Sequence, residues 1–338
     1  MLRFTREQQE YIVNLRKIHA MQHADMQARY GNLLSVNNQL IGNASPIPRD
    51  VWATWDREAV QLQRDVLAVF NDLAATVSEP MPIAKLVHHF QTVSDSGSIN
   101  ISLDGRSRAK TDQPLIEYHG TPLPIIDSTF SYGWRQVASA QSEGYALDAA
   151  GRLNANRRVA EKLESLVLEG DNRIRVGDAQ LWGMRTHPMR QTRQTGVTLN
   201  GAAGAQWESE IKATVMLLHD NNFRANATIY VNWDDWYYAG TTQYTTQYAG
   251  KNIAQTVMDM AGVGAVVPSS SVRPNEIIAV VKSKEVIQLL SGMPMTSRAQ
   301  FRANPEDDYN FVVLAAAALQ IKFDANGQCG VAHSAPAP

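Results

Sequence analysis

Residues 120–170 constrain the fold more than any other stretch, because a period-two pattern changes there into a long helical one. Phe130, Tyr132 and Trp134 fall on one side of an extended segment and predict a half-buried strand. From Asp148, a suitable N-cap, to Gly170, a residue type that favours a helix end, apolar residues recur every three or four positions. A helix of about 22 residues, at about 1.5 Å per residue, is roughly 33 Å long. We therefore expect a strand that leads into a long helix, here called the spine helix, on which other elements pack.

The spine helix has two predicted faces. The buried stripe is expected to contain Leu153, Asn156, Val159, Ala160, Leu163, Leu166 and Val167. The solvent face is expected to contain Arg152, Arg157, Arg158, Glu161, Lys162 and Glu164. Gly151 costs about 1 kcal/mol relative to alanine inside a helix, so it indicates either a bending point or a close packing contact.

The composition limits the classes of function. A chain of 338 residues with 44% hydrophobic residues is globular and long enough for more than one subdomain. Its net charge of −2 argues against a dedicated nucleic-acid-binding protein. The longest apolar run, 311–319, has about nine residues, which is too short to span a membrane. The N-terminus lacks the apolar core of a secretory signal, and the single Cys329 excludes an intrachain disulfide. We therefore expect a soluble protein of a reducing compartment.

Residues 92–114 differ abruptly in composition from their surroundings. The segment is polar and rich in glycine and serine, and Asp104-Gly105 is a strong signal for a hairpin turn. Three apolar residues alternate in it: Ile99, Ile101 and Leu103. These are too few to build a core, so we expect an extended β-hairpin that projects from the body or lies on another surface. Its basic residues, Arg106, Arg108 and Lys110, are either a phosphate-contacting patch or a solvated or intersubunit face.

The N-terminal residues form an amphipathic arm in this interpretation. Thr5 and Gln8 have the spacing of a capping box, and a breaker-rich linker separates the arm from a second helix that begins near Asp50 and ends before Pro80. The arm is either a frayed terminal helix or a segment that docks on another subunit.

The chain after Gly170 predicts a hairpin at 172–188, a loop that carries Arg190 and Arg193, and then a compact α/β unit. The expected elements of this unit are helices 205–221, 233–240, 252–260 and 283–294, and strands 227–232, 265–270 and 276–282. Strands are expected again at 295–304 and 311–324, with 329–333 paired to the latter.

No catalytic arrangement withstands comparison with simpler explanations. The neighbours His88-His89 face opposite ways in a strand and cannot share a metal ion. The adjacent Asp234-Asp235 fits the acidic first turn of a helix better than an acid/base pair, which must converge across a cleft. Cys329 has no local basic neighbour except His333. We therefore predict no catalytic, cofactor-binding or metal-binding residue, and no enzyme.

The order of these elements resembles the Hong Kong 97-type major capsid proteins of tailed phages, whose fold is shared by encapsulin nanocompartment shells. The order is helical arm, projecting polar hairpin, strand, spine helix, inserted α/β unit and final β segment. The motifs that carry the resemblance are Leu123-Pro124-Ile125 with Phe130, Asp148, Arg157-Arg158-Val159-Ala160, Leu166-Val167-Leu168-Glu169-Gly170, 228–232 before an aromatic helix, and the strand–helix pair at 277–290. The resemblance covers roughly residues 46–333.

The resemblance implies an α+β fold with six parts. These are an N-terminal arm (1–50), a connecting helix (51–92), an extended loop (93–127), a peripheral domain with the spine helix (128–200), an axial α/β domain (201–290) and a return to the peripheral domain with the C-terminal tail (291–338).

The resemblance also implies a structural function. Many copies would form pentamers and hexamers of an icosahedral shell around double-stranded DNA, with no cofactor and no membrane. The protein would be part of a virion, assembled in the host cytoplasm with a separate scaffolding protein, a cement protein and a portal, and would contact the DNA non-specifically. Gly144, Gly151 and the extended loop are the expected bending points.

The expected intersubunit contacts are basic residues: Arg106, Arg108, Lys110, Arg190 and Arg193. Together with Arg173, Arg175 and Arg185, the last two belong to a basic group that faces either the lumen or a salt-bridged neighbour. Lys110 is the one lysine of the extended loop, and no asparagine and acid partner matches it. We therefore expect a shell without covalent crosslinks.

Two alternatives remain open. An encapsulin-type shell that packages a cargo enzyme would have the same fold. A soluble α/β enzyme with its site in 201–290 would explain the inserted unit, but it leaves the polar hairpin without a purpose.

Overall fold

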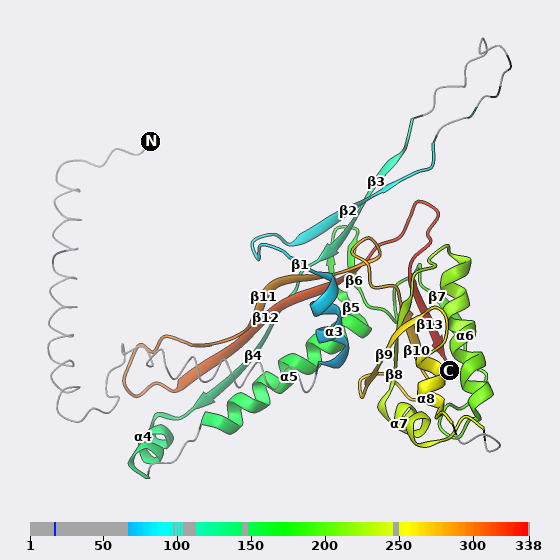
Figure 1. The fold of residues 1–338 in the computed structure, drawn as a ribbon. Helices are drawn as coiled ribbons and strands as arrows, with labels where there is room; N and C mark the ends of the chain where they lie inside the picture. The colour runs from blue at the N-terminus through cyan, green and yellow to red at the C-terminus, as the bar shows by residue number, and fades with distance from the viewer. Residues whose placement is uncertain are drawn as a thin grey trace.

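The protein, seen here in a computed structural model, is elongated and contains two main sheets (Figure 1). The structure describes residue 17 and residues 67–96, 99, 101, 103, 113–143, 148–245 and 250–336. Several sequence predictions lie outside these residues: the arm other than Lys17, the Asp104-Gly105 turn, Arg106, Arg108, Lys110 and Gly144.

A four-stranded sheet runs along the spine helix. Its order is β1 (Ser78–Pro80), β11 (Ile287–Ala299), β12 (Tyr309–Ile321) and β4 (Ile125–Tyr132). The pairs β11–β12 and β12–β4 are antiparallel, and β1 is parallel to β11. One face of β12, which includes Val313, Ala315 and Leu319, belongs to the same buried core as the spine helix.

The spine helix is α5 (Asp148–Leu168), and its predicted start at Asp148 and its end just before Gly170 are confirmed. Val159, Leu163 and Val167 are buried as expected. Leu153, in contrast, is 40% exposed, while Arg152 and Glu164 are buried. These three predictions were wrong, and for Glu164 the reason is a tertiary contact: its carboxylate accepts the backbone N–H groups of Val69 and Phe70.

Strand β4 ends at Tyr132, before the predicted Trp134. Trp134 does not continue the strand but begins α4 (Trp134–Glu143). The change occurs at Gly133, whose backbone N–H donates to Gln136 Oε1 at 3.3 Å and whose carbonyl accepts from Val137 N at 3.1 Å. The short helix is thus set up by local hydrogen bonds that the period-two pattern did not reveal.

The second sheet has five strands and its own helices. The order is β7 (Gln191–Gln194), β13 (Val331–Ala335), β10 (Ile277–Val280), β8 (Ala227–Asn232) and β9 (Val263–Ser269). The helices are α6 (Gly204–Asp220), α7 (Trp233–Thr241) and α8 (Ile253–Met258). The predictions for these three helices and for strands β8, β9 and β10 are confirmed. Helix α6 buries Trp207, Ile211, Val215 and Leu218, as its spacing indicated.

Two predictions near the C-terminus were wrong. Residues 283–294 do not form a helix, because the segment leads into β11, which lies between β1 and β12. A central strand that is covered on both faces has a continuous apolar run, which periodicity alone does not distinguish from a buried helix. Residues 329–333 meet the predicted partner 311–324 only at the Phe323–Cys329 bridge, just after β12, and β13 then joins the second sheet between β10 and β7.

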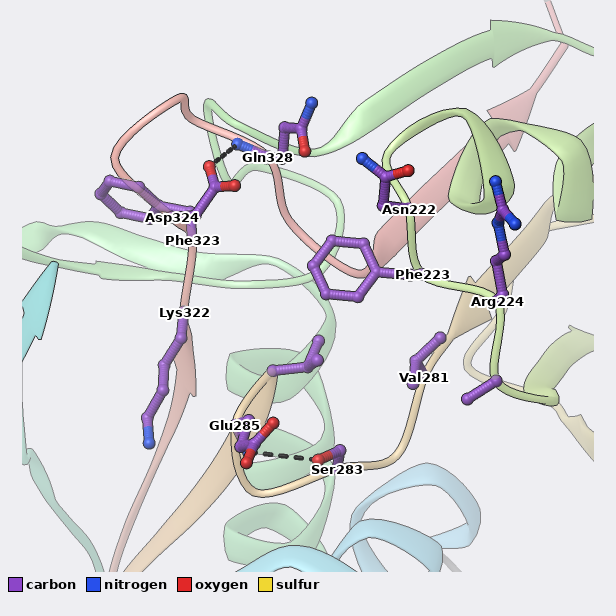
Figure 2. Close-up of a pocket in the computed structure, with 12 residues that line it drawn as sticks. Asn222, Phe223, Arg224, Val281, Ser283, Glu285, Lys322, Phe323, Asp324 and Gln328 are labelled. Carbon is purple, nitrogen blue, oxygen red and sulfur yellow. Dashed lines mark hydrogen bonds between the residues drawn. The ribbon is translucent and has the colours of Figure 1, made fainter. Parts of the chain in front are cut away.

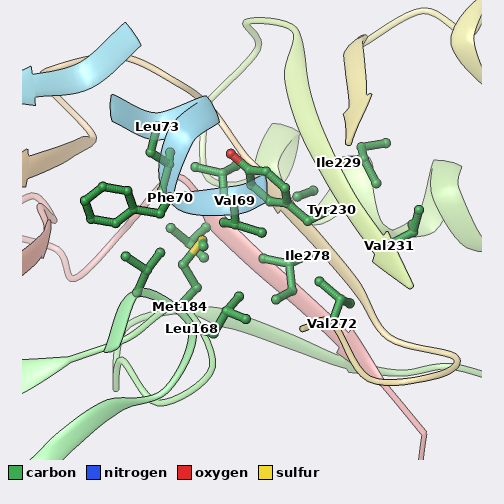
Figure 3. Close-up of a cluster of buried hydrophobic side chains, with 14 of the residues drawn as sticks. Val69, Phe70, Leu73, Leu168, Met184, Ile229, Tyr230, Val231, Val272 and Ile278 are labelled. Carbon is green, nitrogen blue, oxygen red and sulfur yellow. The ribbon is translucent and has the colours of Figure 1, made fainter. Parts of the chain in front are cut away.

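Two hairpins and one short helix complete the described fold. Strands β2 (Val87–Val93) and β3 (Ile116–Pro122) form the base of the projecting hairpin, and β5 (Gly170–Val176) pairs with β6 (Ala179–Trp182). Helix α3 (Ala68–Val77) lies between the spine and the second sheet. Figure 3 shows Val69, Phe70 and Leu73 of α3 beside Leu168, Met184 and Tyr230. This cluster joins the two sheets in one core.

Candidate functional site

Within the described residues, the projecting hairpin exposes several large apolar side chains. We call Leu86, Val93, Leu115, Ile116 and Tyr118 the hairpin ribbon. Their exposed fractions run from 49% for Ile116 to 67% for Leu86. Farther along, Ile99, Ile101 and Leu103 are almost fully exposed. Exposed apolar side chains distributed along a protruding element are typical of an interaction site.

A second open surface lies on the four-stranded sheet, on the face opposite the spine helix. On β4, Ile125, Asp127, Thr129 and Ser131 alternate outward, while the residues between them are half-buried. Directly opposite residues share a face, and Asp127 lies opposite Leu314 and Thr129 opposite Val312. These six residues are here called the open sheet face.

Two of the residues predicted as intersubunit contacts, Arg190 and Arg193, have partners within the chain. Arg193 Nη1 donates to Glu210 Oε2 at 2.6 Å, which joins β7 to α6. Arg190 Nη1 donates to the His187 carbonyl at 2.8 Å, and burial lowers the pKa of Arg190. Their role between subunits stays a prediction, and the same holds for Arg106, Arg108 and Lys110, which lie outside the described residues.

The remaining arginines of the predicted basic group differ from one another. Arg173 pairs with Asp171 at the surface, and Arg175 donates to the Gly177 carbonyl at 2.9 Å. Arg185 is buried against Glu276, with Nε 2.7 Å from Oε1 and Nη2 2.5 Å from Oε2. This group of arginines is therefore not one continuous surface.

Arg185 and Glu276 are the centre of an ionic network between the spine and the second sheet. His333 Nε2 lies 2.6 Å from Glu276 Oε1, and Arg273 N donates to Oε2 at 2.8 Å. Arg185 also pairs with Glu169, the residue after the spine helix, at 3.3 Å. Burial by itself raises the pKa of Glu276, but hydrogen bonds from His333 and Arg185 outweigh it and hold this pKa at about 2. Local sequence gave no signal for this network, because Arg185 and Glu276 are 91 positions apart.

The residues considered for chemistry have structural contacts instead. His88 Nδ1 lies 3.0 Å from Gln320 Oε1, while His89 is exposed. Asp235 is buried and accepts from Asn275 N at 2.7 Å, and burial raises its pKa. Cys329 is fully buried, its thiol donates to the Met189 carbonyl at 3.1 Å, and burial raises its pKa to about 11.

A cavity of about 460 Å³ lies between the turn after α6, the loop before β11 and the turn after β12 (Figure 2). Charges of both signs line it: Arg224, Glu285, Lys322 and Asp324. Lys322 Nζ donates to the Lys284 carbonyl at 2.9 Å, and Asp324 Oδ1 accepts from Gln328 N at 2.8 Å. Lys322 thus joins the end of β12 to the loop before β11, Asp324 holds its own turn, and the lining has no convergent acid and base.

Among the described residues, no group of three or more His, Cys, Asp or Glu side chains is placed to hold a metal ion. In the same part of the chain, no helix is both long and apolar enough to cross a membrane.

Comparison with solved structures identifies the architecture. The chain is similar to the virus-like particle from Pyrococcus furiosus, with 12% identity, 80% of this chain and 95% of that chain covered, and a TM-score of 0.57. It is also similar to the capsid of Myoviridae phage XM1, with 11% identity, coverage of 80% and 92%, and a TM-score of 0.64. The capsid of a native GTA particle matches with 12% identity, coverage of 78% and 89%, and a TM-score of 0.54. At these identities the likeness shows the fold.

Comparison with sequences gives the family. No curated protein matches the chain. A model of a family of unknown function, DUF6260, matches residues 43–334. The chain therefore belongs to the DUF6260 family, and it has the α+β fold of Hong Kong 97-type capsid proteins.

Proposed function

We propose that the protein is the structural subunit of a closed shell, the major capsid protein of a tailed phage. The observation that carries the proposal is the hairpin ribbon, an exposed apolar surface on an element that leaves the body of the molecule. A monomeric protein gains nothing from such a surface, whereas a subunit gains the burial energy when a neighbour covers it. The capsid fold of the chain supports the same conclusion.

The contact is proposed between two different surfaces of neighbouring copies. The hairpin of one copy lies on the open sheet face of the next. The segment of the sequence between its two strands contains Arg106, Arg108 and Lys110. The open sheet face carries Asp127, and the turn at the end of its sheet exposes Glu306 and Asp308. Such a head-to-tail contact closes into rings when the rotation between copies allows it. Rings of five and six copies then tile an icosahedral shell.

The finer parts of the proposal concern the contents and the helpers. With a net charge of −2, the subunit does not hold DNA tightly, which suits a container whose double-stranded DNA is packed by non-specific contact and later released. A separate scaffolding protein, a cement protein and a portal would take part in assembly in the host cytoplasm. The role is mechanical rather than enzymatic.

The test uses the full chain and its source particle. We expect the purified chain to form rings at high concentration, seen by light scattering and negative-stain microscopy. The source particle is expected to be an icosahedral shell with nuclease-protected double-stranded DNA. A chain that stays monomeric at high concentration and lacks a particle would overturn the proposal and favour a soluble enzyme.

An encapsulin-type shell is the second candidate, favoured by the match to the virus-like particle, of which 95% is covered. The contents of the particle distinguish the two. A small shell that holds an enzyme and no DNA would replace the phage assignment.

A further inference from the structure

The base of the projecting hairpin is held by two residues from the end of β12. Gln320 is fully buried, and its Nε2 donates to the His88 carbonyl at 3.1 Å and to Thr121 Oγ1 at 3.3 Å. Its Oε1 lies 3.0 Å from His88 Nδ1. His88 and Thr121 are directly opposite each other in the β2–β3 pair. One side chain of the body therefore binds both strands of the hairpin at the same level.

Phe323 repeats this arrangement one step farther along the hairpin. Its ring centroid lies 5.5 Å from that of Phe90, edge to face, and 4.6 Å from that of His119. Phe90 and His119 are again directly opposite each other. Because side chains alternate across a strand, both contacted pairs lie on one face of the hairpin. Phe323 also meets the buried His187 ring at 5.8 Å, so it connects the hairpin to the loop before β7.

The opposite face of the base is held as well. A Cβ at Gly120 would lie 3.0 Å from Ala179 Cβ, so β6 reaches the hairpin only because this position has no side chain. The docked part ends near Thr92, which is buried, and its pair partner Glu117. From Val93 and Ile116 onward the hairpin is exposed.

We infer that Gln320 and Phe323 are positioning residues, which fix the direction of the hairpin before any neighbour binds. A hairpin held at two levels on one face and against β6 on the other resists tilting and rotation. The hairpin therefore has one direction already in the isolated subunit, so less conformational entropy is lost when a neighbour binds. The benefit of a fixed hairpin direction for assembly rests on the proposed function. The fixed direction itself does not depend on it.

The experiment measures the direction in the dilute, unassembled full chain. Spin labels are placed by Tyr118→Cys on the hairpin and Arg158→Cys on the spine helix, two exposed positions. Cys329 is fully buried and should remain unlabelled. We expect a narrow distance distribution in the otherwise unchanged chain, and a clearly broader one with Phe323→Ala or Gln320→Leu. Amide exchange in β2 and β3 should become about fivefold to tenfold faster.

Matched controls come from the same sheet. Phe301→Ala removes an exposed phenylalanine from the other end of the sheet, and Gln288→Leu alters the glutamine opposite Gln320. Both should leave the distribution narrow. Exchange in β8 and β10 reports whether each variant is folded, and Phe323→Leu replaces Phe323→Ala if the latter does not fold.

Two outcomes overturn the inference. One is a broad distribution of spin-label distances in the chain with an unchanged hairpin base. The other is a narrow distribution in the Phe323 and Gln320 variants when these are folded. Neither depends on shell formation, so failure here is separate from failure of the proposed function.

Discussion

Glu164, near the C-terminal end of the spine helix, caps the first turn of α3 through Phe70. The Glu164 Oε2 atom accepts the backbone N–H of Phe70 at 2.9 Å, and Oε1 accepts that of Val69 at 3.1 Å. The carboxylate thus satisfies two N–H groups that a helix start leaves without partners. This cap explains why a charged residue of the spine helix is buried. It also attaches α3 to the spine helix.

The first prediction concerns this cap. Glu164→Ala leaves two buried N–H groups unpaired and should lower the free energy of unfolding by about 1–3 kcal/mol. Burial raises the pKa of Glu164, so its stabilising contribution is complete below the unfolded value and falls as pH rises through the folded value. Denaturant titrations should therefore show a larger loss at pH 4 than at pH 8. The exposed Glu161→Ala is the control and should change little. Equal losses at both pH values would contradict the assignment.

The second prediction decides between bending and packing at Gly151. A Cβ there would lie 2.1 Å from Tyr132 Oη, and the Gly151 N–H donates to this oxygen at 3.1 Å. Gly151→Ala should therefore destabilise the chain by about 1–3 kcal/mol. Adding Tyr132→Phe removes the oxygen and should recover much of the loss in a thermal-unfolding double-mutant cycle. Gly240→Ala, in α7 with open space around it, should be neutral or stabilising. A neutral Gly151→Ala would favour a bending role.

The third prediction concerns acid stability. Burial, helped by the charge of Arg190, lowers the pKa of His187 to about 4. A lowered pKa means that the neutral ring stabilises the fold above the unfolded value of about 6.5, and that this stability is lost as pH falls towards 4. The loss should be about 3 kcal/mol, measured by urea titrations at successive pH values. His187→Leu should make the free energy of unfolding depend less on pH in this interval. The exposed His89→Leu should leave that dependence unchanged. An unchanged slope in the His187 variant would contradict the prediction.

The fourth prediction tests the network between the spine and the second sheet. Arg185→Ala leaves the Glu276 carboxylate buried without its main cation, which should cost about 3–5 kcal/mol. Arg173→Ala breaks an exposed pair and should leave unfolding nearly unchanged. Calorimetry should also show whether Arg185→Ala separates one transition into two. If both variants unfold like the unchanged chain, the network does not join the two parts.

Long elements with a clear period were predicted well. The spine helix, α6, β8 and β12 follow from spacing alone, because each has one continuous buried side or is buried throughout. The helix predicted at 283–294 was wrong for a physical reason: the segment leads into β11, which pairs with β1 and β12, and its own spacing does not reveal these partners.

Charged residues that take part in tertiary contacts were predicted poorly. Glu164 was assigned to solvent because nothing near it in the sequence reveals the α3 amides 94 and 95 positions away. The network of Arg185 and Glu276 was missed for the same reason. The polar composition of 92–114 predicts a projecting hairpin, and the structure describes the base from which it extends, β2 and β3. The joint of this base at Gln320 and Phe323 could not be predicted, because it depends on contacts across the fold.

The last prediction separates folding from assembly. Leu163→Asp or Val167→Asp places a charge in the buried face of the spine and should abolish folding, as circular dichroism would show. Tyr118→Asp, or a change of Arg106 or Arg108, should leave a folded subunit that assembles poorly, because these residues belong to the hairpin and not to the core. Arg193→Ala is the informative intermediate case. Its intrachain pair with Glu210 predicts a loss of stability in the monomer, whereas an intersubunit role predicts a loss of assembly alone. Particle yield and monomer unfolding, measured on the same samples, distinguish these results. If the spine and hairpin variants behave alike, the division between a folding core and a contact hairpin is wrong.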